Sequence, residues 1–332
     1  MIAFLESKDR LLSELQQSLI NHEFKSSDYN IYTKMERGKN RLIADLPLYP
    51  DRIVHCAVAM VIEDDLNRTL IHQTHASIKG HGTHTAMMDV RKNIHNDPKL
   101  KYCLSMDIHH CYASIPPERI KLMFRDYIKD AEMLDLIDII IDSYTRTGYP
   151  GIALGGRLSP LMANLYLSPL DHYLKEVRHV HVMERYMDNY FILGYSKPWL
   201  HSIRKDIIAN LGELGLTING NWSIRPIDST HRVDMIGWVV YSDHVLIRKK
   251  TKLRMKKCLT EMERKLDHCR PLSESDKGCL ASYMGSLRWF DSYNLRKRLF
   301  DPVVEKQKEW ERWSIGLASY RYFVFYNQEV YQ

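Results

Sequence analysis

The sequence lacks the features that mark membrane, secreted and repeat proteins. No apolar run approaches the roughly 20 residues that a membrane-spanning helix requires, so we expect neither a transmembrane helix nor a membrane partner. Charged residues begin at Glu6, too early for a secretory signal peptide. No internal repeat and no low-complexity segment is present. These absences favour a globular protein of the cytoplasm.

Cysteine is scarce and scattered. No Cys-x-x-Cys pair occurs, and several cysteines lie in apolar segments. This distribution predicts reduced core thiols rather than a disulfide framework. The six residues are Cys56, Cys103, Cys111, Cys258, Cys269 and Cys279.

Basic residues slightly outnumber acidic ones, which gives the 332-residue chain a net charge of +6. Mild basicity fits a polyanionic partner without proving one. The charge is concentrated at residues 248–257, which include seven Lys or Arg residues and no acid. A solvated helix face would also explain this stretch. For a nucleic-acid partner, the binding candidates are Lys249, Lys250, Lys252, Arg254 and Lys256.

Two aspartates are the strongest candidates for chemistry. Apolar residues flank the tetrapeptide Tyr-Met-Asp-Asn at 186–189, which predicts a strand, a two-residue turn and a second strand. Such a hairpin would lift the Asp188 carboxylate to its tip. Asp107 ends the alternating run 102–106 and supplies a second carboxylate. Aspartates in turns usually bond their own backbone, but two strands that deliver one carboxylate each could form a two-metal site for phosphoryl transfer.

Outside these segments, residue spacing and composition predict a simple series of elements near the N-terminus. Leucines at helical spacing predict a helix within residues 1–25. Short strands are expected at 31–34 and 41–45, followed by a helix at about 50–67. Residues 74–85 are rich in glycine and histidine, which predicts a loop.

The segments around the two aspartates resemble the ordered motifs of reverse transcriptases. Residues 101–112 resemble the first catalytic block, and residues 154–167 resemble the Gly-x-x-x-Ser-Pro block. Residues 185–189 resemble the Tyr-x-Asp-Asp block. Several blocks in the right order are far more specific than one motif. Two further segments lie where the next blocks should follow, at 214–216 and 235–238.

This resemblance covers about residues 40–300 and implies an α+β, right-hand polymerase fold. Within the family it is nearest to prokaryotic retroelement enzymes, above all those of diversity-generating retroelements, and to defence-associated enzymes. It implies four parts, namely an N-terminal helix (1–29), fingers (30–100), a palm with the catalytic motifs (101–244) and a basic helical thumb (245–332).

By the same resemblance, Asp107 and Asp188 hold two Mg²⁺ ions, with Mn²⁺ as an alternative, helped by the backbone carbonyl of Ile108. Asn189 departs from the family pattern, which usually has a second Asp there. The change keeps an oxygen ligand but removes a negative charge, so it should weaken or retune metal binding. We expect Asp107, Asp188 and Asn189 to be catalytic. A degenerate scaffold is the alternative.

The resemblance also implies where a nucleotide binds. Tyr112 occupies the position of an aromatic ring that excludes a 2′-hydroxyl and so selects deoxynucleotides. Leu154 and Gly155 stand where the family contacts the incoming nucleotide. Arg41 and Lys79 are the candidates for gripping its triphosphate from the fingers.

Three further residues are candidates for touching the nucleic acid, namely Gly156, Ser159 and Trp222. Gly156 permits close approach of backbone to the template. Ser159, followed by a proline, is also predicted to cap the N-terminus of a helix. Trp222 stands where many family members have a lysine that acts as a general acid toward pyrophosphate.

Four histidines form two His-x-x-His pairs in the loop at 74–85 and just before it, namely His72, His75, His81 and His84. A zinc site would need four convergent ligands, typically with cysteine or carboxylate partners. We therefore expect these side chains to contact phosphate or solvent.

The sequence thus predicts an RNA-directed DNA polymerase that copies a structured RNA template into DNA from deoxynucleoside triphosphates. The resemblance implies an accessory protein or second subunit, and a role in a bacterial or phage retroelement or in antiviral defence. The alternative is a catalytically degenerate subunit that keeps the polymerase fold and binds or assembles RNA.

Overall fold

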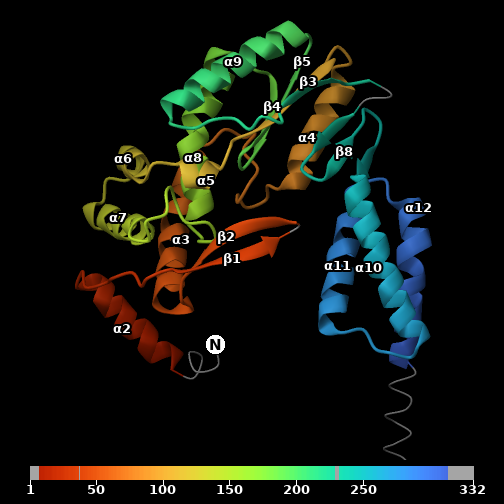
Figure 1. Cartoon of the computed structure of the whole chain (residues 1–332), viewed down its shortest axis with the longest axis horizontal. Coiled ribbons are helices and arrows are strands. Elements are labelled where there is room, and N and C mark those ends of the chain that lie inside the picture. Colours follow the sequence, from red (N-terminus) through yellow and green to blue (C-terminus); the bar gives the residue numbers. More distant parts are fainter. Residues whose placement is uncertain (1–6, 37, 229–231, 313–332) are drawn as a thin grey trace, which may run out of the picture. The chain divides into compact units, whose positions relative to one another are not determined.

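The computed structural model describes residues 7–36, 38–228 and 232–312. The chain divides into two compact units (Figure 1). The first comprises Met1–Val90 and Asp97–Pro226, and the second comprises Arg91–Asn96 and Ile227–Gln332. The expected palm–thumb limit at 244/245 therefore falls inside the second unit, and the four-part assignment stays a prediction. Among the described residues, no helix is both long and apolar enough to cross a membrane.

A four-stranded antiparallel sheet forms the centre of the first unit, in the order β4-β5-β3-β6. The predicted hairpin at 186–189 is confirmed. Tyr186 pairs with Asn189, which leaves Met187 and Asp188 as the two turn residues. The strands are β3 (Tyr102–Asp107), β4 (Val182–Tyr186), β5 (Asn189–Gly194) and β6 (Ser223–Pro226).

Helices bury the apolar face of this sheet. Leu104 and Met106 alternate on β3, so both point to one face, where they join the core formed with the helices. The helices contribute residues at intervals of three and four, such as Leu200, Ile203 and Ile207. The helices in this core are α3 (Ile53–Arg68), α6 (Pro117–Tyr127), α7 (Ala131–Thr145), α8 (Ser159–His172) and α9 (Lys197–Glu213), and α8 continues into the π-helical turn η2 (Tyr173–Val177).

The N-terminal elements lie close to their predicted positions. The expected N-terminal helix is α2 (Lys8–Ile20), while residues 1–6 lie outside the described residues. The two predicted strands form one antiparallel hairpin, and a π-helical turn leads into α3. The loop prediction was too long, because α4 begins at Thr83. These elements are β1 (Asn30–Glu36), β2 (Lys39–Asp45), η1 (Leu48–Arg52) and α4 (Thr83–Asn96).

The second unit pairs a small antiparallel sheet with a helical bundle. Met255, Leu259, Met262 and Leu266 are buried at helical spacing along α10 and form the core with α11 and the helical segment after it. Residues 301–312 are helical. The elements are β7 (Val233–Met235), β8 (Trp238–Val240), β9 (Val245–Ile247), α10 (Lys249–Asp267), α11 (Glu274–Leu287), α12 (Tyr293–Leu295) and η3 (Arg296–Phe300).

The cysteines are all free thiols, as the sequence predicted. Cys103 and Cys111 are buried in the first unit, but Cys56 and Cys269 are exposed, so not all of them are core residues.

Candidate active site

The two aspartates meet at one end of the central sheet. Asp107 is the last residue of β3 and pairs with Asn189, the first residue of β5. The backbone N–H of Ile108 donates to the carbonyl oxygen of Asp188 at 3.0 Å, which ties the end of β3 to the turn. Met187 has a positive φ of 55°, so the turn reverses the chain within two residues and directs Asp188 to the strand end. The structure therefore brings together the residues that the sequence selected.

Each carboxylate accepts a hydrogen bond from a side-chain amide. Asn189 Nδ2 donates to Asp188 Oδ1 at 2.8 Å, and Asn219 Nδ2 donates to Asp107 Oδ2 at 3.0 Å. Asn219 was missed by the sequence analysis. Its backbone N–H also donates to the carbonyl of Asp107 at 2.8 Å, beside a bridge between Ile108 and Ile218. This short pairing holds the segment after α9 against the end of β3.

The electrostatics of the pair reflect burial and like charge. Burial raises the pKa of the Asp188 carboxyl, and the nearby negative charge of Asp107 raises it further. The amide of Asn189 and the positive charge of Arg41 act in the opposite direction. Two carboxylates in this relation favour a cation between them, since a cation would relieve their repulsion.

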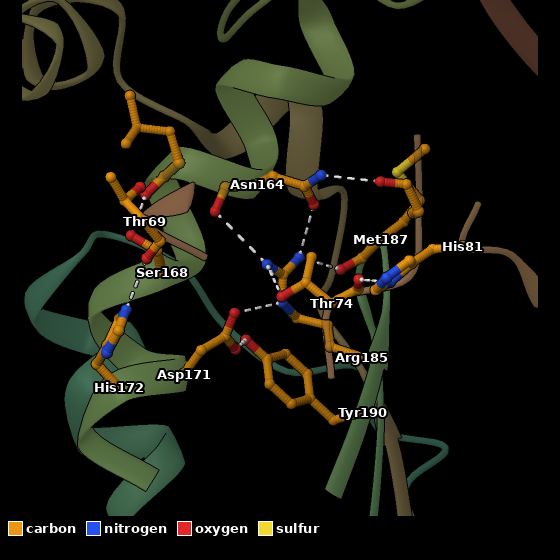
Figure 2. A network of polar contacts seen from close by, with 12 residues as sticks. Thr69, Thr74, His81, Asn164, Ser168, Asp171, His172, Arg185, Met187 and Tyr190 are labelled. Carbon is orange, nitrogen blue, oxygen red and sulfur yellow. Dashed lines mark hydrogen bonds and ion pairs between the residues drawn. The ribbon is translucent and has the colours of Figure 1, made fainter. Parts of the chain in front are cut away.

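The buried side chain of Arg185 supports the turn at Met187 and Asp188. The guanidinium of Arg185 makes an ion pair with Asp171 at 2.7 Å, and both side chains are fully buried. Figure 2 shows the same guanidinium donating to Asn164 Oδ1 at 3.0 Å and to the Met187 carbonyl at 3.1 Å. The Tyr190 hydroxyl donates to the other oxygen of Asp171 at 2.9 Å. Arg185 thus joins α8 of the Gly-x-x-x-Ser-Pro block to the turn that carries Asp188.

Tyr112 lies beside the aspartates and is held from two sides. Its hydroxyl contacts Met187 Sδ at 3.4 Å, and burial raises the pKa of the phenol. Its carbonyl accepts a hydrogen bond from the Ile152 N–H at 2.9 Å. Gly151 has a φ of +82°, and a Cβ there would lie 2.2 Å from the Tyr112 carbonyl oxygen. Only glycine allows this approach to the backbone of Tyr112.

The glycine-rich loop before α8 borders a pocket of about 350 Å³. Gly155 and Gly156 line it together with residues of β2 and α3, and Leu154 precedes them as a partly buried residue. Gly155 adopts a φ of +121° next to the carbonyl of Ala44. The N-cap prediction for Ser159 was wrong by one residue, because Leu158 holds that position and Ser159 is the first helical residue.

The predicted triphosphate contacts differ in how they are placed. Arg41 lies on β2, is exposed, and its positive charge lowers the pKa of the Asp188 carboxyl. Lys79 is exposed in the loop before α4, and the described contacts do not join it to the aspartates. Trp222 is partly buried beneath the guanidinium of Arg204, which lies 4.0 Å from the ring centroid.

Similarity to known proteins agrees with this site. Residues 31–223, more than half of the chain, match the family described as "Reverse transcriptase (RNA-dependent DNA polymerase)". The chain belongs to the reverse transcriptase family. It is 24% identical over 155 residues to the group II intron-encoded protein LtrA of Lactococcus lactis subsp. cremoris, a match of 45% of this chain and 25% of LtrA.

A second relative matches at the same identity. A 91 kDa protein in the cob intron of Schizosaccharomyces pombe is 24% identical over 176 residues, which cover 51% of this chain and 21% of that protein. The matches thus span only about a quarter or a fifth of these relatives.

Solved structures of telomerase share the architecture. Apo telomerase from Candida tropicalis superposes with a TM-score of 0.56 at 13% identity, covering 95% of this chain and 66% of that chain. The same telomerase with a fragment of telomeric RNA also gives 0.56 at 14% identity, covering 93% and 58%. At this identity the likeness shows the fold alone. The chain therefore has the predicted α+β, right-hand polymerase fold.

The two aspartates of the candidate site fit a divalent metal. Their donors are hard carboxylate oxygens, which Mg²⁺ prefers. Asn189 adds an amide, but its nitrogen is the atom that points at Asp188, so its oxygen does not contact that carboxylate. The arrangement fits ions held mainly by Asp107 and Asp188.

The histidine prediction was wrong for His75. Its side chain is buried and lies 2.6 Å from Glu184 Oε2, because its segment pairs with β4. Burial, with smaller effects of neighbouring imidazoles, lowers the pKa of His75 to about 4. His81 is also engaged, since its Nδ1 lies 2.9 Å from the Thr74 carbonyl (Figure 2).

The basic stretch lies on the outer face of α10. Met255, Leu259, Met262 and Leu266 of α10 are buried in the core of the second unit, whereas Leu253 and the basic side chains at 249–257 are exposed. This arrangement suits either a solvated face or a polyanion. The exposed candidates are Lys249, Lys250, Lys252, Arg254 and Lys256.

Proposed function

We propose that this protein is an RNA-directed DNA polymerase that extends a DNA strand on an RNA template. The observation that carries the proposal is the pairing of Asp107 with the Asp188 turn at the end of the central sheet. Within a chain of the reverse transcriptase family, this is the arrangement that nucleotidyl transfer requires.

In this proposal Asp107 and Asp188 hold two Mg²⁺ ions, with the carbonyl of Ile108 as a further oxygen ligand. Such ions, when bound, lower the pKa of an attacking 3′-hydroxyl and neutralise charge on a triphosphate. The protein's own contribution is positional. Asn219 fixes the Asp107 carboxylate, and Arg185 fixes the backbone that carries Asp188.

The nucleotide would lie between the palm and the fingers. The Tyr112 ring, whose hydroxyl contacts Met187 Sδ, would exclude a 2′-hydroxyl and so favour deoxynucleotides. The positive charge of Arg41 would act on the triphosphate, with Lys79 contributing from its loop. Leu154 and Gly155 would border the base, and Gly156, Ser159 and Trp222 would contact the template or primer.

The partners are proposed from the same likeness. LtrA is encoded by a group II intron, and one similar telomerase structure contains telomeric RNA. We infer a structured RNA template, a DNA product held partly by the basic face of α10, and an accessory protein or second subunit. We place the protein in the cytoplasm, in a bacterial or phage retroelement or an antiviral defence system. The genes that neighbour its own gene would distinguish a retroelement from an antiviral defence system.

One observation favours a second candidate function. Asn189 replaces an expected carboxylate, and its amide nitrogen bonds Asp188, an arrangement that holds the turn without a metal. A catalytically degenerate subunit that binds or assembles RNA would show the same feature.

Primer extension by the purified full-length protein separates the two candidates. A DNA primer annealed to RNA is supplied with deoxynucleotides or ribonucleotides, and with Mg²⁺ or Mn²⁺. The polymerase proposal predicts extension with deoxynucleotides that stops when the metal is chelated. Tight binding of the RNA–DNA hybrid, with no extension in either metal, would contradict the polymerase and favour the scaffold.

A further inference from the structure

A second group of potential metal ligands lies apart from the catalytic aspartates. His75, Glu184 and Asp89 each present one ligand atom, and the three atoms lie within 4.8 Å of one another. His75 and Glu184 are almost fully buried, with 1% and 2% of their side chains exposed. Asp89 is 37% exposed, so the group has an opening toward solvent.

The fold brings these three residues together from distant parts of the sequence. The segment before α4 pairs with β4, since the His75 N–H donates to the Arg185 carbonyl at 3.0 Å and the Arg185 N–H donates to the Gln73 carbonyl at 2.9 Å. This pairing places His75 next to Glu184. Asp89 comes from α4, one turn after Thr85, so both face the same side.

The Nδ1 atom of His75 has an oxygen partner, as the non-ligating nitrogen of a metal-bound histidine usually does. Its Nδ1 lies 3.0 Å from Thr85 Oγ1, and the Thr85 hydroxyl donates its single proton to the Gly82 carbonyl at 2.8 Å. This bond matches the tautomer in which Nδ1–H donates to Thr85 Oγ1 and the lone pair of Nε2 faces Glu184 Oε2 at 2.6 Å. Metal-bound histidines almost always donate their other N–H to an oxygen in this way.

In that tautomer, His75 Nε2 and Glu184 Oε2 are both acceptors. Because they lie 2.6 Å apart, a proton or a cation must lie between them. The ammonium of Lys175 acts on Glu184 only from a distance, because it is hydrogen-bonded to the carbonyl oxygens of Val180 and His181. Asp89 Oδ2 lies 4.0 Å from Nε2 and adds a second negative charge. A dication held here would be ligated by both carboxylates and by the imidazole nitrogen that faces Glu184.

We propose that His75, Glu184 and Asp89 bind a divalent transition-metal ion of the zinc class. One imidazole nitrogen with two carboxylate oxygens suits Zn²⁺ better than Mg²⁺. Neighbouring ligands in a tetrahedral zinc site lie about 3.3 Å apart, given bonds of about 2.0 Å. The 2.6 Å and 4.0 Å separations lie on either side of that value, so modest side-chain rotations would close the site. Water reaching past Asp89 would complete the coordination.

This site is structural. Glu184 lies on the strand that runs directly into the Asp188 turn, and the ion would fasten that strand to α4 and to the segment before it. The inference stands independently of the proposed polymerase activity, because none of its ligands belongs to the catalytic pair.

The test measures zinc on the full-length protein after the catalytic pair has been disabled by Asp107→Asn and Asp188→Asn. The parent double variant is expected to retain one Zn²⁺ per chain after dialysis, measured by elemental analysis. Co²⁺ added in place of Zn²⁺ should give the visible absorption of a site with nitrogen and oxygen ligands. Zn²⁺ should also raise the melting temperature, because it binds only the folded state.

Two further substitutions in this background assign the metal. Asp89→Asn, at a partly exposed position, should remove the bound zinc and the thermal shift, and His75→Gln should do the same. The matched control is His72→Gln, an exposed histidine in the same segment, which should keep both. The proposal is overturned if the parent binds no zinc and shows no cobalt spectrum, or if His72→Gln loses as much metal as Asp89→Asn. The measurement on the parent double variant can reject the site by itself. The proposal therefore stays testable even if one of the further variants misfolds.

Discussion

Asn219 donates a hydrogen bond to Asp107 across 112 positions of sequence, at 3.0 Å between Nδ2 and Oδ2. With its backbone bond to the same residue, this contact fixes one carboxylate of the candidate site from the segment that follows α9. Each of the two carboxylates therefore accepts a hydrogen bond from an asparagine amide, Asp188 from Asn189 and Asp107 from Asn219.

Asn219→Ala should slow DNA synthesis without unfolding the protein. Loss of one hydrogen bond to a charged group costs about 1.5–3 kcal/mol, which corresponds to a roughly 10- to 150-fold slower reaction if the whole effect falls on the transition state. Single-turnover incorporation measures it, with Asn210→Ala on α9 as the matched control. Equal rates for the Asn219→Ala variant and the wild type would contradict a positioning role.

Arg185→Met should strongly destabilise the first unit. The substitution leaves Asp171 buried without its partner, which costs about 3–5 kcal/mol. Adding Asp171→Asn should recover part of the loss, because the buried charge is then gone. Urea unfolding followed by circular dichroism measures both.

The matched control for Arg185 is Arg68→Met, which removes an exposed ion pair with Asp65 and should cost at most about 1 kcal/mol. If Arg185→Met were no more costly than Arg68→Met, the buried network would not be what stabilises the turn.

Tyr112→Val should weaken discrimination against ribonucleotides. The smaller side chain opens the space that the ring occupies beside Met187, so the preference for deoxynucleotides should fall by about tenfold or more, or roughly 1.4 kcal/mol. The measurement compares kcat/KM for a deoxynucleotide and its ribonucleotide. Tyr127→Val, at an exposed position on α6, is the control, and an unchanged ratio in the Tyr112 variant would rule out the sugar gate.

Asn189→Asp should change the response to metal. It adds a negative charge beside Asp188, worth roughly 4 kcal/mol for unit charges at about 4 Å and an effective dielectric of about 20. We expect half-maximal activity at a lower Mg²⁺ concentration, a shifted preference between Mg²⁺ and Mn²⁺, and higher general polymerase activity. Asn189→Ala separates the charge from the loss of the amide. Identical metal titrations for Asn189→Asp and the wild type would place this residue outside the metal's reach.

The sequence predicted the elements whose signal is local. Apolar residues on both sides of the 186–189 tetrapeptide define two strands and a tight turn, and the ordered motifs give the partner strand that ends in Asp107. These local patterns are sufficient to place both aspartates at one end of a sheet.

Long-range polar contacts could not be predicted in the same way. Asn219 and His75 lie in polar segments without periodicity, and their roles depend on pairing with β3 and β4. Arg185 gave a signal that was overlooked, because an arginine between strand residues of an apolar hairpin must find a buried partner. The N-cap of α8 was misplaced by one residue, since the helix begins at Ser159 itself.

The most direct test of the polymerase assignment is single-nucleotide extension of a DNA primer on an RNA template by Asp107→Asn and Asp188→Asn, each compared with wild type. Both substitutions keep side-chain shape and remove one carboxylate charge. Each rate should fall below about one-thousandth of wild type, a barrier increase of roughly 4 kcal/mol. Asp126→Asn, at an exposed site on α6, should be unaffected. A folded Asp107 or Asp188 variant that extends the primer at nearly the wild-type rate would contradict the assignment.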